Sequence, residues 1–301
     1  MRPWRSERAW EIRPGDGPVV TVALHAGHEV SPEVAARLAL PEPIRLREED
    51  PGTDLFTELG TTRVVVHRSR FQVDLNRPRE AAVYRTPQAA WGLDVWGDGG
   101  PPEELVALAL EEYDAFYDEM EHLLAAKVER WGRIAVYDLH SYNHRRRGPA
   151  APPDDPATAP EINVGTGAID RARWETVVDR FIAELACCDF DGRRLDVREN
   201  VRFLGGHFPA WVARTFPRSG CPLAIEVKKT YMDEWTGEID RAAAEEVRAA
   251  LAATVPRVAE ALRRVSPSSP RLRYAVRERR AATPGPSWLA KGPTATPAGR
   301  R

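Results

Sequence analysis

A histidine stands near the end of two apolar runs in this chain. The run Arg133–Val136 leads into Tyr137-Asp138-Leu139-His140, and the run Val19–Leu24 leads into His25-Ala26-Gly27-His28. In an open α/β sheet, ligands bind beyond the ends of the strands. Two strands that each deliver a histidine to such an edge predict a metal site, and a metal site predicts an enzyme.

The type of metal follows from the available ligands. A hydrolytic zinc site needs about three protein ligands and one open position for water. We take His25 and His140 as the first two ligands, while the third is His28, Asp50 or Asp54. The acidic segment 47–54 that holds both aspartates is equally consistent with a solvated turn. The three cysteines have no Cys-x-x-Cys spacing, so His, Asp or Glu must hold the metal, either Zn²⁺ or another divalent ion.

Two carboxylates, one at the end of an apolar strand and one inside another, have candidate roles beside such a metal. Asp138 would orient a ligating imidazole, or simply bond to backbone at a strand end. Glu226 interrupts the apolar run Leu223–Val227, where a carboxylate is costly unless it is paired or functional. Burial raises the pKa of such a group and a metal lowers it, which suits a general base near neutral pH. The alternative is a salt bridge with Lys228 or Lys229.

A further group of side chains suits the capture of a substrate carboxylate by guanidinium and amide donors: Arg70, Asn76 and Arg77. They flank the segment Phe71–Leu75, which we predict to be a strand. An ion pair with Asp74 would also explain the arginines. His207, in a predicted turn at Gly205–Phe208, either donates to a ligand or is structural.

Strands that alternate with helices must position these side chains. The predicted strands are Val19–Leu24, Arg63–His67, Phe71–Leu75, Arg133–Tyr137 and Pro222–Val227. The predicted helices are 102–131, 171–186 and 242–265, with a short one capped by Ser31. This order favours a three-layer α/β domain with a parallel or mixed sheet over residues 1–265. The Arg/Pro-rich tail 266–301 is expected to be flexible after a short strand.

Composition excludes several classes of protein. The 301 residues are 43% hydrophobic and 29% charged, with a net charge of −2, which argues against a nucleic-acid-binding surface. No run approaches the ~18 apolar residues of a membrane span, and the N-terminus lacks the apolar core of a signal peptide. We therefore expect a cytoplasmic protein with a small-molecule substrate and neither a membrane nor a nucleic-acid partner. The sequence leaves the oligomeric state open.

Several of these segments, taken together, resemble the N-formylglutamate amidohydrolase family from about Leu24 to Gly237. The resemblance rests on motifs in one order: His25-Ala26-Gly27, the acidic loop with Asp50 and Asp54, Ser69-Arg70-Phe71 with Asp74-Leu75-Asn76-Arg77-Pro78, Asp138-Leu139-His140-Ser141, Asn163-Val164-Gly165-Thr166, Gly205-Gly206-His207, and Ile225-Glu226-Val227 with Thr230-Tyr231-Met232. It implies a phosphorylase/hydrolase-like fold similar to that of zinc carboxypeptidases. That fold is a three-layer αβα domain with a mixed central sheet.

The resemblance also implies a role for each matching residue. His25, His140 and Asp50 would be the zinc ligands, with Asp50 preferred to His28, and Glu226 would be the general base. Asn76 and Arg77 would grip the substrate carboxylate, with Arg70 as helper. The implied reaction is zinc-dependent cleavage of a linear amide, as in the deformylation of N-formyl-L-glutamate to formate and glutamate.

Parts of the chain depart from the family's pattern and leave alternatives open. Tyr142-Asn143-His144 and the Pro-rich loop 149–160 differ from the usual strings and would line the substrate pocket. A carboxypeptidase-like hydrolase of a peptide or another N-acyl substrate is therefore an alternative. A non-catalytic binding protein on the same fold is an alternative of another class, and a cysteine hydrolase using Cys221 is a third.

Overall fold

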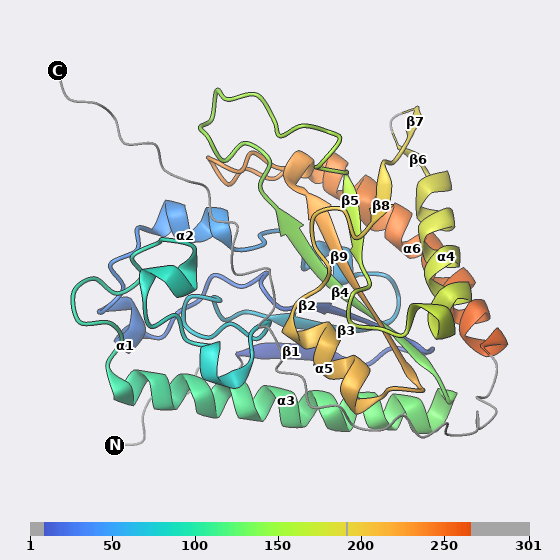
Figure 1. Cartoon of the computed structure of the whole chain (residues 1–301), viewed down its shortest axis with the longest axis horizontal. Coiled ribbons are helices and arrows are strands. Elements are labelled where there is room, and N and C mark those ends of the chain that lie inside the picture. The colour runs from blue at the N-terminus through green and yellow to red at the C-terminus, as the bar shows by residue number, and fades with distance from the viewer. Residues whose placement is uncertain (1–8, 191, 266–301) are drawn as a thin grey trace, which may run out of the picture.

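A seven-stranded sheet forms the centre of the molecule (Figure 1). The computed structural model describes residues 9–190 and 192–265, and the expected tail 266–301 lies outside these residues. In spatial order the strands are β1 (Trp10–Arg13), β3 (Thr62–Val66), β2 (Val19–Ala23), β4 (Ile134–Tyr142), β9 (Gly220–Lys228), β5 (Ile162–Gly165) and β8 (Val197–Glu199). β6 (Asp189–Phe190) and β7 (Arg193–Arg194) form a separate two-stranded sheet.

The central sheet is mixed, as predicted. β2 pairs in parallel with β3 and β4, and β4 pairs in parallel with β9. β5 runs antiparallel to β9, and the edge strand β1 runs antiparallel to β3. The carboxyl ends of the three central strands β2, β4 and β9 therefore meet at one edge of the sheet.

Helices cover both faces of this sheet and complete the three layers (Figure 1). Apolar side chains of α4 (Arg171–Cys187) and α6 (Arg241–Arg264) pack on one face, and those of α3 (Glu103–Trp131) and α5 (His207–Thr215) pack on the other. The remaining short helices are α1 (Pro32–Ala35), α2 (Glu42–Glu48), η1 (Leu55–Thr57), η2 (Arg79–Ala81), η3 (Pro87–Ala90) and η4 (Lys229–Tyr231). Within the described ranges, no helix is both long and apolar enough to cross a membrane.

Capping residues fix the helix ends close to where the sequence predicts them. The Ser31 hydroxyl accepts the N–H of Val34 at the start of α1. Asp170 and Asp240 cap α4 and α6 in the same way. Gly132, at φ +73°, ends α3 in a backbone conformation that glycine adopts without a steric penalty.

The predicted strand Phe71–Leu75 is wrong. Its apolar side chains are buried as expected, but the segment forms turns in which Ser69 O accepts the N–H groups of Gln72 and Val73. The neighbouring strand β3 already has β1 and β2 on its two sides, so no edge is left for a further partner there. His207 is also misplaced by the prediction, because it begins α5 rather than lying in a turn.

Candidate metal centre at the carboxyl edge of the sheet

The pleat of β4 and β9 places the side chains of Asp138, His140 and Glu226 on one face of the sheet. β4 continues through Tyr142, five residues beyond the predicted end at Tyr137, so Asp138 and His140 lie inside the strand. Odd-numbered neighbours such as Leu139 pack against α4 and α6, which turns the even-numbered side chains to the opposite face. Glu226 lies directly opposite His140 in the parallel register of β4 and β9.

His25, Asp50 and His140 converge on one point. One possible ligand atom of each lies within 4.8 Å of the other two, and all three residues are buried. Asp50 Oδ2 is 3.0 Å from His140 Nδ1 and 3.4 Å from His25 Nδ1. The backbone bond from Asp50 N to His25 O, 2.9 Å long, fastens the acidic loop to the end of β2.

The outer nitrogens of both imidazoles face carboxylates. His25 Nε2 is 2.8 Å from Asp74 Oδ1, and His140 Nε2 is 3.0 Å from Asp138 Oδ1. The Nδ1 atom of His25 is buried and has no hydrogen-bond partner. Carboxylates that hold the far nitrogens while the near ones face a common point are typical of histidine-bound metals. The donor set and the orphaned nitrogen therefore fit a divalent metal such as zinc.

The charges of the cluster depend on one another. Burial by itself would raise the pKa of Asp50, but its hydrogen bond with His140 and the nearby His25 imidazole outweigh this effect, and the pKa is lowered. Burial by itself would lower the pKa of His140, but the charge and hydrogen bond of Asp138, together with the bond to Asp50, raise it well above its ordinary value. The carboxylates of the cluster thus favour positive charge at His140, beside the point where a cation would bind.

Glu226 is half-buried beside this cluster. Burial raises the pKa of its carboxyl group to about 7, although the nearby His140 acts in the opposite direction. Of the two lysines in the alternative role, Lys228 and Lys229, the second does not pair with Glu226, because the Lys229 ammonium donates to the carbonyls of Arg47 and Glu49 at 2.7 Å each. Those two bonds hold the loop that leads into Asp50.

Asp74 joins the histidines to the arginines. Its fully buried carboxylate contacts His25 through Oδ1 and, through Oδ2, accepts hydrogen bonds from Arg70 Nη2 at 2.8 Å and from the Tyr84 hydroxyl. Arg77 Nε lies 3.8 Å from Oδ2. The sequence suggested Asp74 only as an ion-pair partner of the arginines. Its place two residues before the Asn76-Arg77 pair was the available signal for a larger role.

Asn76 links the cluster to α5. Its Nδ2 is 3.2 Å from His140 Nε2, and its Oδ1 accepts the N–H of Phe208 at 2.9 Å. Its carbonyl accepts the N–H of His207. Because Gly206 has no side chain to cap α5, Asn76 supplies the cap from a distant segment, and a Cβ at Gly206 would strike the Asn76 amide. The ring of His207 packs edge-on against Tyr117, and burial lowers its pKa.

The other proposed third ligands lie elsewhere. His28 Nδ1 bonds to Glu49, and its Nε2 faces Glu42 and Arg45, so the ring points away from the cluster. Asp54 begins the turn η1, where its carbonyl accepts the N–H of Thr57. The geometry thus brings Asp50 to the two histidines and separates His28 and Asp54 from them.

The two segments that differ from the pattern of the resembled family, Tyr142–His144 and the Pro-rich loop 149–160, are held by contacts near the site. The Tyr142 hydroxyl donates to the carbonyl of Pro160, and Arg202 lies over the Tyr142 ring at 4.9 Å. Arg202 also pairs with Asp154 at 2.8 Å. These contacts connect the Pro-rich loop to the segment before α5.

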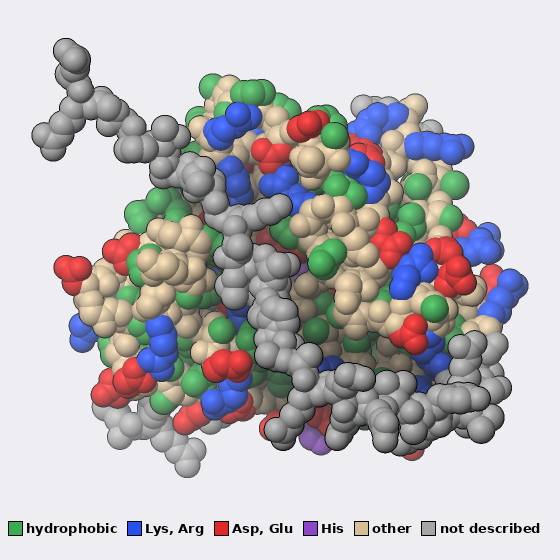
Figure 2. All heavy atoms as spheres, viewed as in Figure 1, with side chains coloured by type: hydrophobic (Ala, Val, Ile, Leu, Met, Phe, Trp, Pro, Cys, Tyr) green, Lys and Arg blue, Asp and Glu red, His purple; other side chains and the backbone are tan. Residues whose placement is uncertain are grey.

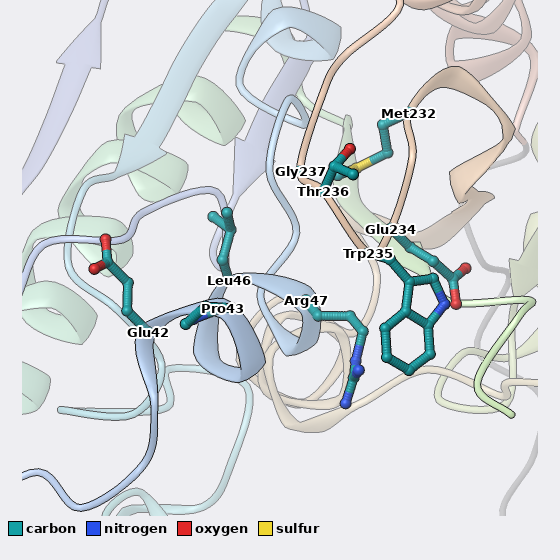
Figure 3. A pocket seen from close by; sticks show the side chains of 9 residues that line it. All are labelled: Glu42, Pro43, Leu46, Arg47, Met232, Glu234, Trp235, Thr236 and Gly237. Atoms are coloured by element: carbon teal, nitrogen blue, oxygen red, sulfur yellow. The ribbon is translucent and has the colours of Figure 1, made fainter. Parts of the chain in front are cut away.

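Other features that could carry chemistry lie apart from this cluster. A cavity of about 160 Å³ lies between α2 and residues 232–237, where the Arg47 guanidinium lies 4.2 Å from the centre of the Trp235 ring (Figure 3). The metal-cluster residues do not line it. Cys221 is fully buried and burial raises the pKa of its thiol, which argues against a cysteine nucleophile. On the face shown in Figure 2, acidic and basic side chains are interspersed over the described residues.

Comparisons with known proteins agree with this architecture. Residues 17–232 match the family model described as N-formylglutamate amidohydrolase. N-formylglutamate deformylase from Pseudomonas aeruginosa is 27% identical over 234 residues, which span 73% of this chain and 84% of that protein. The fold resembles the crystal structure of N-formylglutamate amidohydrolase from Ralstonia eutropha, with a TM-score of 0.65 and 18% identity over 85% of this chain and 98% of that one. It also resembles a gene product of Agrobacterium tumefaciens, with a TM-score of 0.60 and 19% identity over 85% and 96% of the two chains.

Proposed function

Because this chain belongs to the N-formylglutamate amidohydrolase family, we propose that it is a metal-dependent amidohydrolase of N-formyl-L-glutamate or a closely related N-acyl acidic amino acid. The name of the Pseudomonas relative supports the choice of substrate. The observation that supports the chemistry most is the convergence of His25, Asp50 and His140 on one point beside Glu226. Formate and glutamate would be the products.

We assign the metal to the three converging residues. His25, Asp50 and His140 would hold the ion through two imidazole nitrogens and one carboxylate oxygen, a set of three protein ligands typical of hydrolytic zinc sites. When bound, such an ion supplies a Lewis acid that polarises the amide carbonyl and makes water more acidic. Asp74 and Asp138 would hold the imidazoles with their Nδ1 atoms toward the ion.

Glu226 is the proposed general base. Its carboxylate would take a proton from the attacking water and deliver it to the amide nitrogen as the C–N bond breaks. A half-buried carboxylate with a pKa raised to about 7 exchanges a proton readily near neutral pH. Proton transfer of this kind contributes about 10²–10⁴-fold to a rate.

Arginines and an amide would bind the substrate's carboxylate. Arg70 and Arg77 both flank Asp74, and Asn76 lies between that segment and His140. A guanidinium fork suits a carboxylate because two N–H groups can donate in parallel. Arg70 or Arg77 would also stabilise the developing oxyanion, an effect worth roughly 3 kcal/mol in typical enzymes. His207, at the start of α5, is a further proposed donor to the substrate.

Formate release from N-formyl-L-glutamate tests the proposal. The purified protein is assayed as isolated, after treatment with a chelator, and after addition of Zn²⁺, Mn²⁺ or Co²⁺. We expect hydrolysis that the chelator abolishes and a metal restores. N-acetyl-L-glutamate, N-formyl-L-leucine and a peptide ending in glutamate complete the panel. Preference for the peptide would favour a carboxypeptidase-like activity, and a metal-free protein that hydrolyses none of them would favour a binding protein.

A further inference from the structure

Trp91 is a tryptophan with a left-handed backbone and a half-exposed ring. It follows η3 with φ 55° and ψ 28°, and 53% of its surface is exposed. Residues with a bulky side chain rarely adopt this conformation, which glycine, asparagine and aspartate tolerate. A tryptophan that gains little burial therefore occupies a position where glycine would be favoured. Strained residues of this kind cluster at functional sites.

The exposed ring faces two of the proposed substrate-binding arginines. The guanidinium carbon of Arg70 lies 4.8 Å from the centre of the ring, and that of Arg77 lies 5.5 Å from it. The Tyr84 ring packs edge-on against the same indole at 5.6 Å, and the Tyr84 hydroxyl reaches Asp74. Trp91 thus contacts both arginines directly and is linked through Tyr84 to Asp74, which reaches the metal cluster.

We propose that Trp91 is a specificity-determining residue that selects substrates with a carboxylate. Its indole would hold the two guanidinium groups in place by cation–π attraction. Arg70 already donates to Tyr84, Asp74 and the Glu48 carbonyl, so the indole would fix the position of its positive charge beside the ligand. The ring would also keep water from one side of the substrate's carboxylate, and the lower local dielectric would strengthen the ion pairs between that carboxylate and the arginines. This inference rests on the proposed function, because it assigns the arginines to the substrate.

Ring removal tests the role of Trp91. For Trp91→Ala we expect KM for N-formyl-L-glutamate to increase about tenfold, the size of a cation–π contact of about 1.4 kcal/mol, with kcat changed less than about twofold. The diamide of N-formylglutamate has no carboxylate, so its kcat/KM should be the same in both proteins. Trp91→Phe keeps a ring over the arginines and should recover most of the affinity.

Two further variants distinguish the effect of losing the Trp91 ring from the effect of its backbone conformation and from that of removing any exposed tryptophan. Trp91→Gly relieves the left-handed conformation and should melt at a higher temperature than Trp91→Ala, with the same increase in KM. Trp131→Ala is the matched control, because Trp131 is 38% exposed and its ring lies 5.3 Å from Arg130 at the end of α3. This variant should keep the wild-type KM. Recovery of KM in Trp91→Gly would show that the backbone, not the ring, matters and would overturn the inference.

Binding of L-glutamate to the metal-loaded protein, measured by calorimetry, separates the two proposals. Weaker binding in Trp91→Ala than in the wild type supports the role of Trp91, even if the wild type hydrolyses no formylglutamate and the proposed function fails. Equal Kd and equal KM in the two proteins overturn the role of Trp91, even if hydrolysis occurs. A wild type that neither binds glutamate nor hydrolyses the substrate overturns both.

Discussion

Replacing Asp74 with asparagine tests whether one carboxylate supports both the metal cluster and the arginines. Asp74 is fully buried, 2.8 Å from both His25 Nε2 and Arg70 Nη2. Asp74→Asn keeps the shape of the side chain and removes its charge. It therefore leaves the Arg70 guanidinium, whose side chain is only 13% exposed, without its counter-charge. It also removes the anion that orients His25.

The loss of the counter-charge of Arg70 and the loss of the anion beside His25 differ in expected magnitude, and each is measured separately. Breaking a buried ion pair by removing one partner typically costs about 3–5 kcal/mol, so we expect a decrease of that order in the free energy of unfolding. Loss of a carboxylate behind a ligating histidine typically weakens metal binding by about 10–100-fold, or roughly 1.4–2.7 kcal/mol. Urea unfolding of the metal-free protein measures the first effect. Competition with a chromophoric zinc chelator measures the second.

A double variant distinguishes the two effects. Adding Arg70→Met to Asp74→Asn removes the unpaired guanidinium, so stability should recover by several kcal/mol while zinc affinity stays low. The reasoning fails if Asp74→Asn unfolds within about 1 kcal/mol of the wild type and binds zinc with the wild-type affinity. Recovery of zinc affinity in the double variant would show that Asp74 acts on the metal only through Arg70.

Three other predictions concern the base, a turn and a buried ammonium. Glu226→Gln should keep its zinc, measured by elemental analysis, while kcat falls about 10²–10⁴-fold, and near-wild-type turnover would exclude Glu226 as the base. Gly27→Ala should lower the melting temperature and weaken zinc binding, because a Cβ there would strike the backbone of His67; an unchanged melting curve would contradict this. Burial lowers the pKa of Lys229 to about 8 from 10.5, so the unfolded state binds its proton more tightly. The charged Lys229 ammonium therefore reduces the stability of the folded state below pH 8. In urea unfolding, the free energy of unfolding of the wild type relative to that of Lys229→Met should rise between pH 8 and 10.5. A difference that stays constant over this range would contradict the lowered pKa of Lys229.

Local sequence patterns determined most of the layers of this fold. The apolar runs that became β2, β3, β4 and β9 are buried on both faces, and the three- and four-residue periodicity of α3, α4 and α6 marked the helices that cover them. These signals depend on neighbours along the chain and on burial. They can be read without knowing which segments meet.

Which strands pair, and in which register, could be determined only from the tertiary structure. Phe71–Leu75 has the composition of a strand, but a strand requires a free edge, and β3 has none at that place. The short strands β5 and β8 exist because β9 offers an edge to β5, and β5 offers one to β8. Neither the missing edge beside β3 nor the pairing of β5 and β8 can be read from the residues of those segments alone.

The sequence by itself provided the residue types of the candidate site, and only the tertiary structure decided how they are arranged. Histidine near the ends of two apolar runs and a glutamate inside a third were visible without coordinates. The choice of Asp50 over His28 depended on a loop that folds back onto β2 and is held by Lys229. Trp91, which has a left-handed backbone, contacts Arg70 and Arg77 from a segment that follows them in the chain. Each of these outcomes depends on atoms far apart in the chain, and no local spacing encodes such distances.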